Sequence, residues 1–311
     1  IEFCLDESHK DGSIKDIVKK DLSRYIIKTP EVVQGLERYK HHGKKLFLLT
    51  NSFHDYSKAL LDYAINPYLK KHSDWSELFD IVITGAQKPR FFYDRLKILK
   101  VDPKSGLMSN YETDLVSGMY QGGSADTFTK SLKISGEEIL YVGDHIYGDI
   151  VRLKKDCNWR TALVVEELDQ ELEALKKAKP LDDRIQTLMH EKDPLERRVL
   201  EMLTRSREDG QPIDSKELDS LQAKIGEIDG KLRDIIRRHQ ENFNPLWGEV
   251  MRIGAEESYF ATQVERYACV YMAKLEDLLS ISPRAYLRAQ KTLMPHEVVI
   301  GLQLQSASVE S

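Results

Sequence analysis

The alternation of apolar runs with helical segments predicts an α/β fold with a mainly parallel sheet. Short apolar runs occupy residues 46–49, 80–84, 138–142 and 160–165. Between several of these runs, apolar residues recur every three to four positions, which is the spacing of an amphipathic helix. Strands separated by helices pair in parallel, and a continuous apolar run fits a strand that is buried on both faces.

The composition is that of a globular protein with no broad affinity for polyanions. Of 311 residues, 41% are hydrophobic and 31% are charged, which is enough for a sizeable core. Lys and Arg number 46 and Asp and Glu 51, so the formal net charge of −5 disfavours nucleic acids and anionic membranes as partners. Apolar runs such as Leu46–Leu49 fall far short of the roughly 20 residues that span a bilayer. Cys4, Cys157 and Cys269 are too scattered for a disulfide framework or a zinc cluster, and we expect a cytoplasmic protein.

The amino-terminal part predicts helices on either side of the first strand. Apolar spacing predicts helices within 14–42, with Pro30 in the first turn of the second helix and Gly43 at its end. Residues 57–68 predict another helix. The segment 89–125 is rich in turn formers, and we expect irregular structure with a short hairpin there.

The carboxyl-terminal part predicts helices outside the sheet. Between residues 218 and 235, apolar residues form a seam by recurring at alternating intervals of three and four, which predicts a helix. We expect it to pack against a preceding helix at 194–207, with a turn between the two at 209–212. We expect the charged faces of this hairpin to be solvated. A further single helix is expected over 256–279, with its aromatic side chains in the core. The seam comprises Leu218, Leu221, Ile225, Ile228, Leu232 and Ile235.

Two carboxylates follow the apolar run at 138–142. Asp144 comes directly after Gly143, and Asp149 lies five residues further on. Two such groups beside a buried strand repel each other unless a cation lies near them. Mg²⁺ prefers oxygen ligands of this kind and keeps waters or a substrate phosphate in its other positions. The alternative is that the acidic residues cap the helix that follows.

Two other strand ends carry polar residues of the kind that bind phosphate. Thr50, Asn51 and Ser52 follow the run at 46–49, and Lys88 follows the run at 80–84. Taken singly, hydroxyl residues commonly cap helices and a lysine is usually a surface residue. Their order along the chain is more informative, because the carboxyl ends of parallel strands meet at one edge of a sheet, where α/β proteins bind ligands.

This order resembles motifs two, three and four of the haloacid dehalogenase superfamily, which consists mostly of Mg²⁺-dependent phosphatases. Seven strings carry a more specific resemblance: LLTNS at 48–52, QKPRFF at 87–92, QGGSADT at 121–127, YVGDHIYGDI at 141–150, WRTALVVEEL at 159–168, SYFATQVERYACVYMAKL at 258–275 and YLRAQKTLMPHE at 286–297. Through them the chain resembles, over most of its length, the cytosolic purine 5′-nucleotidases that prefer IMP and GMP. The resemblance implies a three-layer Rossmann-like core with an added helical hairpin and carboxyl-terminal helices.

The resemblance implies a role for each polar residue at the strand ends. Asp144 would bind Mg²⁺ directly, and Asp149 would support the metal-bound waters and pair with Lys88. Lys88 would neutralise phosphate charge. Thr50 would bind the transferring phosphoryl group through its hydroxyl, with support from the two residues that follow it.

Residues near the start of the chain are implied to bind the substrate as well. Asp6, His9 and Lys15 lie where the family has purine-contacting and phosphate-side residues upstream of motif two. The string that contains Asp6 and His9 is also typical of a turn.

One departure from the family concerns the nucleophile. The first Asp of a strand-borne DxDxT motif forms an aspartyl-phosphate in this family, and the sequence contains no such motif. We expect that Asp upstream of Ile1, because the chain begins there without an initiator Met and resembles the middle of a longer polypeptide. The 311 residues alone are therefore expected to be inactive, and the missing segment of the same protein is an expected partner.

These observations predict a Mg²⁺-dependent 5′-nucleotidase of purine nucleoside monophosphates, with IMP or GMP as the substrate. Alternatives are a phosphatase of another small phosphate ester and a non-catalytic phosphate-binding and metal-binding fragment. We also expect a homo-oligomer. The expected regions are the end of a substrate or cap region at 1–24, the core with motifs two to four at 25–175, the helical hairpin at 176–250, and helices with a tail at 251–311.

Overall fold

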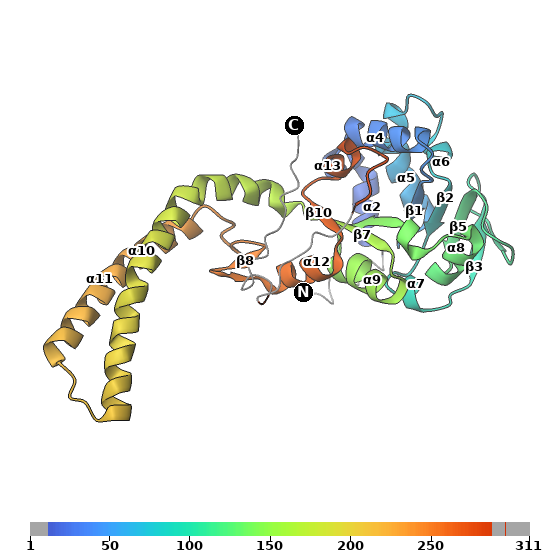
Figure 1. Cartoon of the computed structure of the whole chain (residues 1–311). Coiled ribbons are helices and arrows are strands. Elements are labelled where there is room, and N and C mark those ends of the chain that lie inside the picture. Colours follow the sequence, from blue (N-terminus) through green and yellow to red (C-terminus); the bar gives the residue numbers. More distant parts are fainter. Residues whose placement is uncertain (1–11, 288–295, 297–311) are drawn as a thin grey trace. The chain divides into compact units, whose positions relative to one another are not determined.

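The computed structural model describes residues 12–287 and residue 296 of the chain. The chain forms two compact units (Figure 1). Unit 1 contains the residues up to Glu166 together with those from Thr262 onward, and unit 2 contains Glu167–Ala261.

Unit 1 is built on two sheets, which confirms the predicted α/β class. The larger sheet has the order β1-β2-β5-β3-β4, in which β1, β2 and β5 are parallel and β3 is antiparallel to both of its neighbours. The smaller sheet has the order β10-β7-β6 and is fully parallel. The strands are β1 (Phe47–Leu49), β2 (Ile81–Thr84), β3 (Ile98–Val101), β4 (Met108–Asn110), β5 (Gly118–Gly122), β6 (Leu140–Gly143), β7 (Arg160–Val164) and β10 (Val270–Met272).

Strands β1 and β6 are the end strands of their sheets. Within the residues that the structure describes, β1 pairs with β2 alone and β6 pairs with β7 alone. An end strand leaves one row of backbone N–H and C=O groups without a partner in its sheet. The end strands β1 and β6 therefore each have such an edge, and each of these two strands leads into a predicted functional motif.

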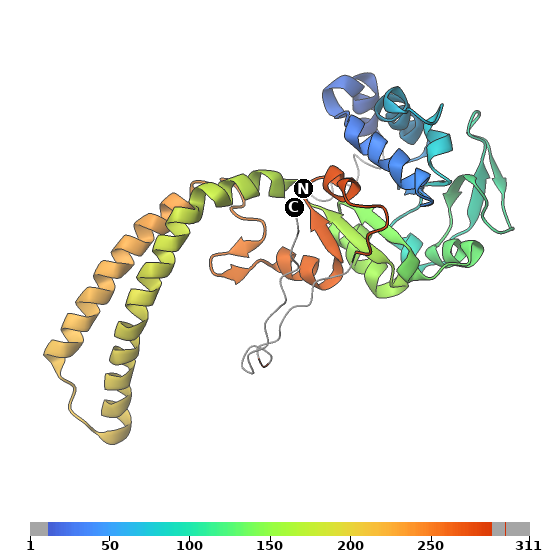
Figure 2. The same cartoon turned by 45° about the horizontal axis from the view of Figure 1, so that its top comes forward.

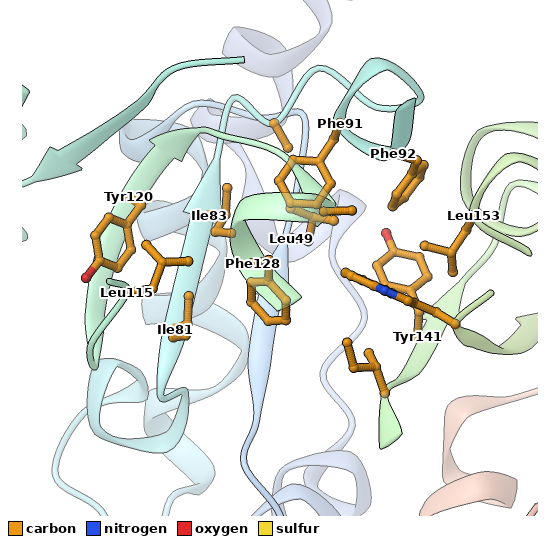
Figure 3. Close-up of a cluster of buried hydrophobic side chains, with 14 residues drawn as sticks. Leu49, Ile81, Ile83, Phe91, Phe92, Leu115, Tyr120, Phe128, Tyr141 and Leu153 are labelled. Atoms are coloured by element: carbon orange, nitrogen blue, oxygen red, sulfur yellow. The ribbon is translucent and has the colours of Figure 1, made fainter. Parts of the chain in front are cut away.

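One hydrophobic cluster joins the two sheets. It contains Leu49 from β1 and Tyr141 from β6, and Figure 3 shows these side chains around the rings of Phe91, Phe92 and Phe128. The ring of Phe47 in β1 lies 6.3 Å from that of Tyr141, centroid to centroid. Burial of these large rings removes apolar area from water for both sheets at once, and so holds them together. The cluster comprises Leu49, Ile81, Ile83, Ala86, Phe91, Phe92, Leu115, Tyr120, Ala125, Phe128, Ile139, Tyr141, Leu153 and Trp159.

The helices predicted before and after the first strand are present. Pro30 begins α4 in the first-turn position that favours proline, and Gly43 follows the helix with a left-handed φ of 83°. The helices of unit 1 are α2 (Ser13–Lys20), α3 (Leu22–Tyr25), α4 (Pro30–His41), α5 (His54–Ala64), η1 (Asn66–Tyr68), α6 (Trp75–Leu78), α7 (Arg90–Tyr93), α8 (Ala125–Leu132), η2 (Gly136–Glu138), η3 (Ile146–Val151), α9 (Arg152–Cys157) and α13 (Leu275–Ser280).

Three local predictions need correction. The hairpin expected within 89–125 is present as β3 and β4, but the segment also contains β5, a strand of the parallel sheet that begins and ends with glycine. The single helix expected over 256–279 is wrong, because α12 (Tyr259–Tyr267) ends before β10 and α13 follows that strand. Pairing of β10 with β7 overrides the helical spacing that Tyr271 shares with the residues before it. The helix expected at 194–207 is part of a much longer helix.

Unit 2 contains the predicted helical hairpin, formed by α10 (Glu167–Asp209) and α11 (Ser215–Gln240) (Figures 1 and 2). All six residues of the predicted seam are at least partly buried. Asp214 caps α11 by accepting hydrogen bonds from the main-chain N–H groups of Lys216 and Glu217. A short hairpin of β8 (Arg252–Ile253) and β9 (Glu256–Glu257) follows.

A buried carboxylate ties α4 to the loop after η1. Glu37 is 3% exposed, and its carboxylate accepts hydrogen bonds from the N–H groups of Lys70 and Lys71, while Nδ1 of His72 lies 3.0 Å from Oε1. Burial disfavours ionisation of Glu37, but these hydrogen bonds outweigh it and lower the pKa of the carboxyl group below its usual value. Glu37 therefore stabilises the loop as a charged group.

We predict that Glu37→Gln weakens this loop at pH 7 by about 1–3 kcal/mol, since an amide accepts fewer and weaker hydrogen bonds than a carboxylate. Hydrogen exchange at the amides of Lys70 and Lys71 measures the loss. Because the pKa is lowered on folding, the ionised carboxylate contributes stability above the unfolded pKa of about 4.3, and this contribution disappears as pH falls through the folded pKa. Glu31→Gln, on the exposed side of α4, is the control; equal exchange in both variants would contradict the assignment.

Candidate active site

Lys88, Asp149 and Tyr141 form a buried polar cluster at the carboxyl ends of β2 and β6. The ammonium Nζ of Lys88 lies 2.7 Å from Oδ1 of Asp149 and donates to the hydroxyl of Tyr141 at 2.8 Å. That hydroxyl donates in turn to the same Oδ1 at 3.0 Å. The side chain of Lys88 is 16% exposed and that of Asp149 is 5% exposed. The structure thus brings together two residues that the sequence places 61 positions apart.

Gly143 allows Asp149 to reach this position. A Cβ atom on Gly143 would lie 2.5 Å from Cβ of Asp149 and 2.8 Å from its Cγ, which no real side chain tolerates. The loop between them is closed by main-chain and side-chain bonds: Asp149 N–H donates to the carbonyl of His145, and Gly148 N–H donates to Nδ1 of His145 at 2.8 Å. The close approach of Asp149 therefore requires a glycine before Asp144.

The loop after β1 holds the main chain of Lys88. The side-chain amide of Asn51 donates to the carbonyl of Lys88 at 2.9 Å and accepts from the N–H of Lys88 at 2.5 Å. Ala86 N–H donates to the carbonyl of Thr50, and Thr50 Oγ1 accepts from Ser52 N–H. Both polar atoms of the Asn51 side chain are thus engaged with the main chain of Lys88.

Asp144 is exposed at the end of β6, in contrast to the buried Asp149. Its carboxylate is available for a ligand from solvent, and its negative charge acts on Tyr141 from nearby. Among residues 12–287 and 296, no group of three or more His, Cys, Asp or Glu side chains is arranged to hold a metal ion. Mg²⁺ takes only one or two carboxylates and completes its shell with waters and phosphate, so an exposed strand-end aspartate fits this ion.

Tyr141 is a polar member of the cluster that the sequence pattern did not predict. It is 5% exposed and lies in the middle of an apolar run, where it counts as a core aromatic residue. Burial, followed by the negative charges of Asp149 and Asp144, raises the pKa of its hydroxyl well above the usual value. The hydroxyl therefore stays protonated. The sequence feature that could have identified Tyr141 as a site residue is its position three residues before Asp144, the first aspartate of the motif.

Of the three residues predicted near the chain start, the structure describes Lys15. Lys15 lies in α2, where its ammonium stands 5.5 Å from the ring centroid of Tyr56 in α5. Asp6 and His9 lie outside the described residues. The site that the structure assembles therefore consists of the loop after β1, Lys88 after β2, and Tyr141, Asp144 and Asp149 around the end of β6.

Comparison with known proteins places the chain in a family. A profile described as the 5′ nucleotidase family matches residues 1–299. The chain belongs to the 5′ nucleotidase family. It is 29% identical over 303 residues to 5′-nucleotidase domain-containing protein DDB_G0275467 of Dictyostelium discoideum, which covers 96% of this chain and 48% of that protein. It is also 29% identical over 310 residues to 5′-nucleotidase domain-containing protein 2 of rat and of human, covering 96% of this chain and 50% and 54% of those proteins.

The chain thus spans about half the length of the curated relatives that it matches. None of the helices described in this member of the 5′ nucleotidase family combines the length and the apolar character needed to cross a membrane. The longest of the described helices, α10, carries charged residues along its length.

We predict that Gly143→Ala destabilises this 5′ nucleotidase family chain by about 1–3 kcal/mol, because the added methyl group displaces Asp149 from its buried position. Urea denaturation of the chain together with its expected upstream segment measures the free energy of unfolding. Gly226→Ala is the matched control, since a Cβ there meets no atom within 4 Å and alanine favours a helix. A Gly143→Ala variant as stable as Gly226→Ala would show that Asp149 does not occupy the place described.

Proposed function

We propose that this chain forms the greater part of the active site of a Mg²⁺-dependent 5′-nucleotidase with the haloacid dehalogenase architecture. The proposed substrates are purine nucleoside 5′-monophosphates, IMP or GMP. The observation that supports the proposal most directly is the cluster of Lys88, Tyr141 and Asp149 beside the exposed Asp144, in a chain of the 5′ nucleotidase family.

The cluster suits phosphoryl transfer because Asp149 is buried beside Lys88 whereas Asp144 is exposed to solvent. Lys88 is held near the open end of the sheet by a buried partner, so it can offset the negative charge of a phosphate without moving. Thr50 would contact the transferring phosphoryl group through its hydroxyl, and Asn51 and Ser52 would support it. Asp144 would hold Mg²⁺, which neutralises charge on the phosphate when it is bound.

The nucleophile is proposed to come from a strand that pairs with both β1 and β6. Each of these strands has a free edge among the described residues, and a parallel strand between them would end beside Lys88 and Asp144. An aspartate there would attack phosphorus through a carboxylate oxygen, and the bond to the 5′ oxygen would break. The nucleoside then leaves as its alcohol, and water cleaves the aspartyl-phosphate to regenerate the carboxylate and release phosphate. Cys157 is unsuited to this role, because burial raises the pKa of its thiol to about 12.

A second candidate is a chain that binds phosphate and Mg²⁺ without turnover. It is favoured by one observation: Asp149, the buried carboxylate after β6, is engaged by Lys88 and Tyr141 and is therefore not free to act as a nucleophile. A phosphatase of another small ester is the alternative within the enzyme class. Location in the cytoplasm and self-association stay predictions from the sequence.

The proposed function is tested by phosphate release from IMP, GMP, dCMP and glucose 6-phosphate, with Mg²⁺ and with EDTA. The protein is the chain together with the strand that carries the nucleophile. We expect Mg²⁺-dependent hydrolysis of the two purine nucleotides, little with the others, and none after Asp144→Asn. Preferential hydrolysis of glucose 6-phosphate would favour the other phosphatase, and binding of inorganic phosphate without turnover would favour the non-catalytic chain.

We predict that the 311 residues alone release no phosphate from IMP and are either insoluble or poorly cooperative on melting. Free strand edges beside an apolar strand favour aggregation, and the proposed nucleophile belongs to a strand other than those described. Adding the strand-bearing segment as a second chain should restore both catalysis and a cooperative melt. The control segment carries Asn in place of the nucleophilic Asp and should restore the melt alone. Phosphate release by a cooperatively folding 311-residue chain would overturn the proposal for the nucleophile.

We predict that Lys88→Ala lowers kcat for IMP by a factor of about 10²–10³, which corresponds to the roughly 3–4 kcal/mol of a single electrostatic donor. The loss of positive charge leaves Asp149, Asp144 and the phosphate to repel one another. Steady-state kinetics of the completed enzyme measure it. Lys104→Ala replaces an exposed lysine and should leave the rate unchanged. A near-normal rate in Lys88→Ala would contradict the assigned role.

A further inference from the structure

The ammonium group of Lys88 has two of its three N–H bonds committed. One is directed to Oδ1 of Asp149 and one to the hydroxyl of Tyr141, and these two acceptors are themselves joined by a hydrogen bond. The three polar groups therefore form a closed triangle. An ammonium group held by a single acceptor rotates about its terminal C–N bond, whereas two fixed acceptors determine the direction of the third N–H.

The main chain of Lys88 is fixed as well. Asn51, in the loop after β1, holds both its N–H and its carbonyl, whereas Tyr141 in β6 and Asp149 in η3 hold its ammonium group. A lysine side chain has about 2 kcal/mol of rotamer entropy to lose, and a site that removes this freedom before substrate binds does not lose it during the reaction.

We propose that Tyr141 is a positioning residue for Lys88. Its hydroxyl accepts one ammonium N–H and donates to Asp149, and this leaves one N–H of Lys88 oriented for an oxygen of the substrate phosphate. Tyr141 acts through Lys88 and makes no covalent change in the reaction. Its deep burial keeps the phenol neutral, so it adds no charge to a site that already holds two carboxylates. The inference rests on the proposed function for its kinetic consequence.

The same hydrophobic cluster contains a matched control. Tyr120 is also fully buried, and its hydroxyl also makes two hydrogen bonds, accepting from the N–H of Val116 and donating to its carbonyl. Figure 3 shows Tyr120 and Tyr141 at opposite sides of the cluster, on different sheets. Tyr120→Phe and Tyr141→Phe each remove one buried hydroxyl, and they differ in whether Lys88 loses a partner.

The kinetic test compares the two variants in the completed enzyme with IMP and Mg²⁺. We expect Tyr141→Phe to lower kcat by about 10- to 100-fold, the range expected for a hydrogen bond to a charged group, with KM changed less than about threefold. Tyr120→Phe should retain kcat. Incorporation of 3-fluorotyrosine at position 141 keeps the hydroxyl and should restore the rate. If kcat of Tyr141→Phe equals that of Tyr120→Phe, the positioning role is overturned.

A second measurement is independent of turnover. Proteins with ¹⁵N at lysine Nζ report slow exchange of an ammonium group that is held by fixed acceptors, and Lys88→Arg identifies the resonance of Lys88. We expect this resonance to be protected from exchange with water in the parent and in Tyr120→Phe, and to lose protection in Tyr141→Phe. Retained protection in Tyr141→Phe overturns the inference. An inactive parent that shows the expected pattern of protection overturns the proposed function and leaves the positioning of Lys88 supported.

Discussion

The ion pair between Lys88 and Asp149 joins the carboxyl ends of strands that belong to two different sheets, and the surrounding structure follows from burying both charges. A carboxylate that is 5% exposed is unfavourable unless its oxygens are hydrogen bonded. Oδ1 accepts from the lysine and the tyrosine, and the other oxygen lies 3.4 Å from the N–H of His145. Asp149 can reach these partners only because residue 143 lacks a side chain. Burial of this one ion pair thus depends on Gly143, on the hydroxyl of Tyr141 and on the turn at His145.

The two sheets of unit 1 meet through side chains more than through backbone. The aromatic cluster beneath them and the ion pair at their carboxyl ends connect β1 and β2 with β6, while no described strand pairs with both sheets. Backbone groups at a free edge need partners as strongly as buried side chains do. The candidate site therefore lies where the described backbone pairing is interrupted, with the residues proposed to bind phosphate on one side and the carboxylate proposed to bind the metal on the other.

Strand order carried most of what the sequence could predict. Lys88, Asp144 and Asp149 were expected to lie close together because each follows a buried strand. In the structure, Lys88 and Asp149 both form hydrogen bonds with Tyr141. The β5 strand was missed because GMYQG begins and ends with the residue least typical of strands, and its place is set by pairing with β2 and β3. The β10 strand was hidden by helical spacing around it. Asn51 was assigned to phosphate, and its bonds to the main chain of Lys88 depend on a loop contact that local sequence does not encode.

A buried ion pair is weak evidence for stability, because removing two charges from water costs about as much as their attraction returns. Well-packed apolar residues fill such a space at least as favourably, and the surroundings of this pair are already apolar, with Phe92 and Trp159 against the ring of Tyr141. The presence of a lysine, a carboxylate and a phenol in that setting fits the proposed phosphate site better than a purely structural role. Because both the main chain and the ammonium group of Lys88 are held by hydrogen bonds, this lysine can contact a phosphate without reorganisation. The cost of burying the pair is then met by the surrounding aromatic core, which links structural stability in unit 1 to the chemistry at its edge.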